Sequence, residues 1–125
     1  RVLGDLALNH IIPTAISYQN TLIENVKGLK EILPDVYAEV GNVQLESIKE
    51  ISRHIKEIKT MVNEMTEARK VANNNFPNEV ERAEAYSVTV RPYLEKIRYH
   101  IDKLELLVDD EIWPLPKYRE LLFSR

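Results

Sequence analysis

The chain has 125 residues, a length that favours one domain with a core large enough to fold without covalent or metal staples. It contains no cysteine, which excludes disulfide frameworks and thiolate metal sites. The net charge is −3 with 30% charged residues of both signs, which argues against a nucleic-acid-binding surface. Neither a signal peptide nor an apolar run of the roughly 18 residues that a membrane span needs is visible. We therefore expect a cytoplasmic protein with no membrane partner.

The first predicted helix runs from about residue 3 to residue 33 and stops before Pro34. Pro13 should bend it near Asn9, because proline removes a backbone donor and clashes with the preceding turn. Its apolar arc is about 160° wide at the angular spacing of a helix. Ile11 and Tyr18 extend the arc on one side, and Ile16 and Ile23 extend it on the other. Such a wide arc predicts two partners, the helix's own bundle and something else.

The second predicted helix runs from about 43 to 73 and has the cleanest heptad spacing. Asn42 is the predicted N-cap, and left-handed asparagines at 73–75 are the predicted end. The side chains expected to face its neighbours are Ile48, Ile51, Ile55, Ile58, Val62, Met65, Arg69 and Ala72.

The third predicted helix follows Asn78, which forms a capping box with Glu81. Pro92 should kink it. The expected inward positions are Val80, Ala83, Ser87, Val90, Leu94, Ile97, Ile101, Leu104 and Val108.

Short connections at 34–42 and 74–78 make successive helices antiparallel neighbours. The sequence therefore predicts an all-α fold, in which three long antiparallel helices form an elongated up-down-up bundle and a short C-terminal helix docks back. Residues 1–125 are expected to form a single domain. Because the chain begins at Arg1 and its only methionines are Met61 and Met65, we expect it to be trimmed or part of a longer protein.

Few side chains in this sequence predict catalysis. None of the three histidines falls on a predicted inward face, and His54, flanked by Glu50 and Glu57, is expected on an exposed, salt-bridging face. The sequence has no glycine-rich phosphate loop and no thiol nucleophile. We predict no catalytic, cofactor-binding or metal-ligating residue in this segment, which weighs against a metal or haem bundle.

The C-terminal stretch "WPLPKYRELLF", residues 113–123, breaks the pattern of the long helices. Pro114 and Pro116 forbid a continuous helix, although Pro116 can open a short new one. So many large apolar side chains predict a docking tail over residues 113–125 that packs on a helical surface. The predicted docking residues of helix and tail together are Ile11, Ile16, Tyr18, Ile23, Trp113, Leu115, Tyr118 and Leu122.

Together with "NHIIPTAISYQNTLIENVKGLKEI" at residues 9–32, this tail resembles the C-terminal region of bacterial type III glutamine synthetases. The resemblance implies a much longer parent enzyme that joins glutamate and ammonia, using ATP and Mg or Mn, and assembles as two stacked hexameric rings. The catalytic domain of the same chain and neighbouring subunits would then be its partners. The family's metal-binding and phosphate-contacting motifs are absent here, so the segment is expected to be inactive alone.

Two functions from different classes remain open at this point. The first is a non-catalytic domain of a glutamine synthetase with an architectural or oligomer-supporting role. The second is a free-standing helical adaptor that binds partner helices, because heptad spacing alone does not separate the two.

Overall fold

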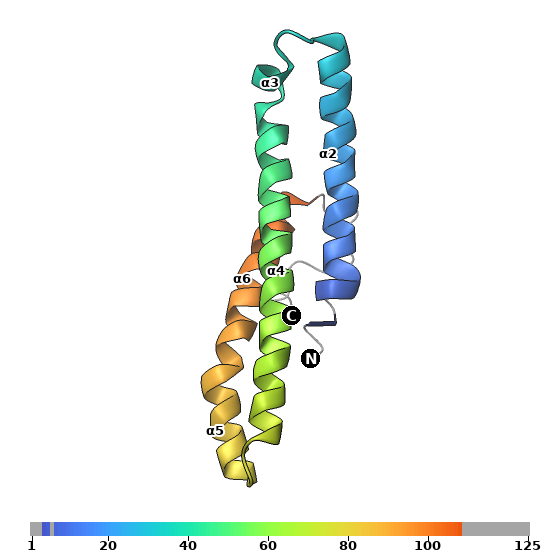
Figure 1. Ribbon diagram of the computed structural model, residues 1–125. Helices are drawn as coiled ribbons and strands as arrows, with labels where there is room; N and C mark the ends of the chain where they lie inside the picture. The colour runs from blue at the N-terminus through green and yellow to red at the C-terminus, as the bar shows by residue number, and fades with distance from the viewer. Residues whose placement is uncertain (1–3, 6, 109–125) are drawn as a thin grey trace, which may run out of the picture.

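The structure is a computed structural model that describes residues 4, 5 and 7–108, and every regular element in that part of the chain is helical. A single π-helical turn, η1 (Ala7–Ile11), leads into α2 (Ile12–Ile32). The short α3 (Tyr37–Val40), which the sequence did not predict, precedes the long α4 (Asn42–Asn74), and α5 (Glu79–Thr89) and α6 (Arg91–Leu107) complete the described elements. The prediction of an elongated all-α bundle with antiparallel neighbours is confirmed (Figure 1).

The three layers of this bundle are staggered along α4, which contacts both of the others (Figure 1). Helix α2 has no buried side chain after Ala15, α4 has none before Ile51, and α5 has none at all. Helix α6, which does contribute buried side chains, lies beside the middle of α4 (Figure 1). Among the described residues, a three-helix core therefore exists only around the middle of α4, and a two-helix arm extends from each side of it.

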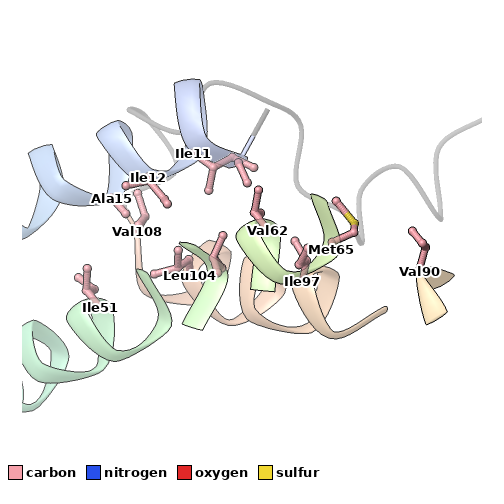
Figure 2. Packing of buried hydrophobic residues seen from close by; sticks show 12 residues of the cluster. Ile11, Ile12, Ala15, Ile51, Val62, Met65, Val90, Ile97, Leu104 and Val108 are labelled. Atoms are coloured by element: carbon pink, nitrogen blue, oxygen red, sulfur yellow. The ribbon is translucent and has the colours of Figure 1, made fainter. Parts of the chain in front are cut away.

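The central core is formed by aliphatic side chains from all three layers, as Figure 2 shows. Ile51 and Ile58 of α4 meet Ile97 and Leu104 of α6, and each of these four is 0% exposed. Burial of one such side chain contributes about 1.5–3 kcal/mol to folding. The members of the core cluster are Ala7, Ile11, Ile12, Ala15, Ile51, Ile58, Val62, Met65, Val90, Ile97, Leu104 and Val108.

Three predicted inward positions of the third helix are wrong. Val80, Ala83 and Ser87 are exposed, although they continue the same spacing as Ile97. The reason is the stagger: α5 packs on the far end of α4, where no described segment supplies a third helix. Within the described part of the chain, Val80, Ala83 and Ser87 therefore have no third helix to bury them.

The helices are irregular before both prolines. The third helix is interrupted at the buried Val90, two residues before Pro92, and divides there into α5 and α6. Before Pro13 the chain forms the wider π-helical turn η1, which makes room for the proline ring. The Thr14 hydroxyl donates to the His10 carbonyl oxygen at 2.8 Å, which gives that carbonyl a partner.

The helix ends agree with the sequence at one cap and differ at two. The backbone N–H of Glu81 donates to the Asn78 side-chain oxygen at 2.8 Å, as the capping box predicts. Gly41, and not Asn42, is the N-cap of α4. Helix α4 ends at Asn74, and Asn75 has a φ of −103°, so the predicted left-handed asparagine is wrong. A turn stabilised by the backbone N–H of Asn75 donating to the Val71 carbonyl replaces it.

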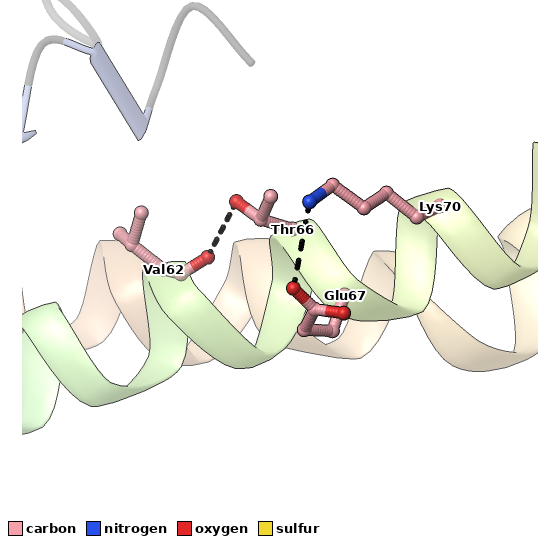
Figure 3. A network of polar contacts seen from close by, with 4 residues as sticks. All are labelled: Val62, Thr66, Glu67 and Lys70. Atoms are coloured by element: carbon pink, nitrogen blue, oxygen red, sulfur yellow. Dashed lines mark hydrogen bonds and ion pairs between the residues drawn. The ribbon is translucent and has the colours of Figure 1, made fainter.

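The outer face of α4 carries the alternating charges. Lys70 Nζ and Glu67 Oε2 form an ion pair at 3.6 Å (Figure 3). In the same helix, the Thr66 hydroxyl donates to the Val62 carbonyl oxygen. The side chains of this ion pair are 62% and 73% exposed, and exposed pairs of this kind contribute about 0–1 kcal/mol. This part of α4 therefore presents its charges to solvent.

Candidate docking surfaces and a buried histidine pair

The four predicted docking residues of the first helix have different environments. Ile11 is 1% exposed and belongs to the core, whereas Ile16 is 42% exposed. Tyr18 is half-buried against the core, and Ile23 is half-buried as well. The predicted tail residues Trp113, Leu115, Tyr118 and Leu122 lie outside the described residues. Of these four predicted docking residues, Ile16 therefore offers the most apolar surface for contact.

The first two-helix region, here called the α2–α4 arm, comprises residues 17–50. No side chain in it is buried. Amide hydrogen bonds tie the two helices together: Gln19 Nε2 donates to the Ile48 carbonyl oxygen at 2.9 Å, and Gln44 Nε2 donates to Asn25 Oδ1 at 2.8 Å. The large apolar side chains exposed at its tip are Ile32, Leu33, Val36, Val40 and Val43.

The second two-helix region, the α4–α5 arm, comprises residues 66–89. Ala72 is its one buried residue. Between the α4–α5 connection and the side of α5 lies an open groove of about 610 Å³, whose lining includes Phe76, Ala85, Val88 and Glu84. The large apolar side chains exposed on this arm are Val71, Val80, Tyr86 and Val88. Large apolar side chains exposed in this number favour an interaction site on this arm.

A buried polar pair lies between α4 and α6, where the sequence predicted none. His54 and His100 are 2% and 8% exposed, and their Nδ1 atoms are 2.8 Å apart. The predicted exposed face for His54 is therefore wrong. His54 follows Ile51 by three residues and precedes Ile58 by four, so it occupies an inward position beside the half-buried Ile55. His100 has the same relation to Ile97 and Leu104 on α6, a spacing that was readable in the sequence.

The hydrogen bond between the two rings requires that they differ. One Nδ1 must carry the hydrogen and donate it, while the other Nδ1 must offer its lone pair, so the rings are in opposite tautomers when neutral. The rings of Tyr99 and His100 are arranged edge to face, with ring centroids 5.1 Å apart. No buried side-chain polar atom of the described residues lacks a hydrogen-bond partner. The bond between the two imidazoles supplies the partner for each buried Nδ1 atom.

Burial also sets the protonation of the pair. It lowers the pKa of His54 below its ordinary value, and Arg53 and His100 lower it further. Burial lowers the pKa of His100 as well, although Glu57 opposes this shift. Both imidazoles are therefore held neutral more firmly than free histidine.

The described residues contain no group of three or more histidine, aspartate or glutamate side chains that could hold a metal ion. Two imidazoles by themselves supply half of the four ligands that zinc prefers.

Burial raises the pKa of Asp102 on α6. No described helix is long and apolar enough to cross a membrane.

Comparison with known proteins relates the whole chain to one enzyme family. No family model matches it. It is 60% identical over 126 residues to the glutamine synthetase of Bacteroides fragilis (strain YCH46), a match that covers 100% of this chain and 17% of that protein. It is 28% identical over 129 residues to the type-3 glutamine synthetase of Dictyostelium discoideum, covering 98% of this chain and 17% of that protein. The chain thus spans about a sixth of the length of these relatives. The predicted resemblance to the C-terminal region of type III glutamine synthetases is confirmed.

Proposed function

We propose that this chain is a non-catalytic, architectural domain of a type III glutamine synthetase, and that its two arms pack on other parts of the assembled enzyme. The observation that carries the proposal is the pair of apolar arms. Val43 and Val80, at opposite ends of the bundle, are 74% and 69% exposed, which gives each arm an apolar surface for a partner. The matches to short segments of much longer proteins favour partners within an enzyme over the free-standing adaptor.

The parent protein, in this proposal, joins glutamate and ammonia with ATP and a divalent ion, Mg or Mn, in the cytoplasm. It assembles as a homo-oligomer of stacked hexameric rings. The catalytic domain of the same chain covers one arm, and a neighbouring subunit covers the other. The proposal assigns the residues that bind ATP and metal to the remainder of the enzyme. The described part of this segment holds no group of three or more histidine, aspartate or glutamate side chains that could bind a metal ion.

The tail has a separate role in this proposal. Residues 113–125 fold back on the flank of the first helix that carries Ile16, and the apolar side chains of the tail cover that flank. Ile16 is 42% exposed on the helix surface, so a docked tail would bury apolar area there. A terminus with that much apolar contact should be ordered.

A charge placed on each arm tests the architectural role. The first variant of the full-length enzyme carries Val80→Glu and Val88→Glu, and the second carries Ile32→Glu and Val43→Glu. A matched control carries Thr60→Glu and Asn63→Glu, two exposed positions of α4 that lie outside both arms. Sedimentation gives the assembled fraction, and the rate of ATP-dependent glutamine formation gives the activity.

We expect both arm variants to lose assembly and activity together, because a buried unpaired carboxylate is costly at an interface. The control should assemble as the wild type does. The same substitutions in the isolated 125-residue chain should leave its melting temperature within a few degrees, since all four valine and isoleucine side chains are exposed in it. Normal assembly and activity in both arm variants would refute the architectural role.

A further inference from the structure

We propose that the His54–His100 pair makes the junction between α4 and α6 sensitive to acid: the junction is stable while both rings are neutral and is weakened when they are protonated. The proposal starts from geometry. The two Nδ1 atoms are 2.8 Å apart, and the rings are 2% and 8% exposed. Water therefore has little access to replace the hydrogen bond once it is lost.

The number of hydrogens in the pair explains the sensitivity. A first added proton can enter at Nε2 of the donor ring, where it preserves the Nδ1 hydrogen bond but places a charge between the two helices. A second proton removes the acceptor, because both Nδ1 atoms then carry hydrogens and face each other at 2.8 Å. Two cationic rings at that distance repel, and neither has its partner.

The surroundings of the pair disfavour such charges. His54 lies between Ile51 and Ile58 along α4, and His100 lies between Ile97 and Leu104 along α6. Each of these four neighbours is 0% exposed. An ion transferred into such apolar packing loses its hydration without compensation.

Charged groups around the pair act in both directions. Arg53 opposes a positive charge on both rings and Lys103 opposes it on His54, whereas Glu50 favours it on His54 and Glu57 favours it on His100. Two further acidic residues, Asp102 and Glu105, come after His100 on α6. Glu105 is engaged in an interaction within the protein. Of the described residues of α2, none is among the charges that act on either ring. The carboxylates therefore moderate the effect of acid without abolishing it.

The direction of the pH dependence follows from burial. The pKa of each ring is lowered in the folded chain, while an unfolded histidine keeps a pKa of about 6.5. The contribution to stability is therefore complete above pH 6.5 or so and is lost as the pH falls below it, because the unfolded chain then binds protons that the folded chain does not. Between pH 7.5 and 5.5 the unfolding equilibrium constant should rise up to about tenfold for each histidine, and up to about a hundredfold for both.

The test measures the unfolding constant by urea titration at several pH values from about 5.5 to 7.5 in three forms of the chain. These are the wild type, the double variant His54→Leu with His100→Leu, and the control His10→Leu, which replaces the exposed histidine of η1. Leucine has a similar size and no titratable group. We expect the wild type and the control to show the same rise toward low pH, and the double variant to show a tenth of it or less. A double variant with the rise of the wild type would overturn the proposal.

A second measurement needs no change at the pair. In the variant His10→Asn the only remaining histidines are His54 and His100, so its imidazole NMR signals belong to them alone. Both signals should keep the chemical shifts of neutral rings as the pH falls through 6.5, and their later change should coincide with unfolding. If both rings instead titrated at the ordinary value in the folded chain, the proposal would be wrong even where the leucine variant does not fold.

Discussion

The stagger of the bundle makes a quantitative prediction for one substitution at three isoleucines. Ile97 is 0% exposed in the three-helix core, Ile55 is half-buried beside it, and Ile32 is 75% exposed at the tip of the α2–α4 arm. Ile→Ala removes the same three carbon atoms at each site. Only the local packing differs, so the three costs measure how far the core extends.

The expected cost of Ile97→Ala is about 2–5 kcal/mol, because the lost transfer energy is joined by the cost of the cavity. For a chain of this length, each kcal/mol of destabilisation lowers the melting temperature by about 4 °C, so the expected decrease is about 8–20 °C. Ile32→Ala should change the stability by less than about 0.5 kcal/mol, as for exposed sites. Ile55→Ala should fall between these two values.

Urea titrations followed by far-UV circular dichroism, with equal slopes required for all three variants, would give the three free energies. The order Ile97, Ile55, Ile32 is the result that supports the stagger. If Ile32→Ala were as costly as Ile97→Ala, the isolated chain would bury its α2–α4 arm, and the restriction of the core to the middle of α4 would be wrong.

Three further predictions concern the pair, the tail and the chemistry. His54→Ala should destabilise the chain by about 1–3 kcal/mol in a urea titration, because it leaves His100 Nδ1 without its partner, whereas His10→Ala at the exposed site should change little. Deletion of residues 113–125 should lower the melting temperature and increase self-association in sedimentation, and unchanged values for both would place the partner of the tail elsewhere in the enzyme. The isolated chain should form no glutamine from glutamate, ammonia and ATP at any concentration. A metal-dependent rate from the pure chain would contradict the prediction that this segment has no catalytic or metal-ligating residue.

The helices and their antiparallel order were predictable because local rules determine them. Apolar spacing marks the inward side of α4, Pro92 sits where the third helix divides, and the Asn78 cap forms as its sequence indicates. Each of these features depends on residues within one or two turns. Contacts between distant parts of the chain are not needed to specify them.

The stagger and the histidine pair were not predictable in the same way. Val80 and Ile97 continue one spacing, yet Val80 is 69% exposed and Ile97 is 0% exposed. The spacing shows which side of a helix is apolar, but the neighbours that cover this side depend on the relative heights of three helices. His54 was missed for a related reason. Its position is polar by composition and inward by spacing, and only its partner His100 on another helix makes that burial acceptable.

The lengths of the helices argue for a role beyond the stability of this bundle. Helix α4 has 33 residues and is about 50 Å long, whereas its part of the core cluster, from Ile51 to Met65, spans about 20 Å. If α4 served the core alone, its two ends could be polar or absent. Instead these ends carry the exposed valines Val43 and Val71. The arms thus expose apolar side chains that lower solubility without adding to this core. Such surfaces gain free energy only when something outside the bundle covers them, which is the physical reason to expect a larger assembly around this domain.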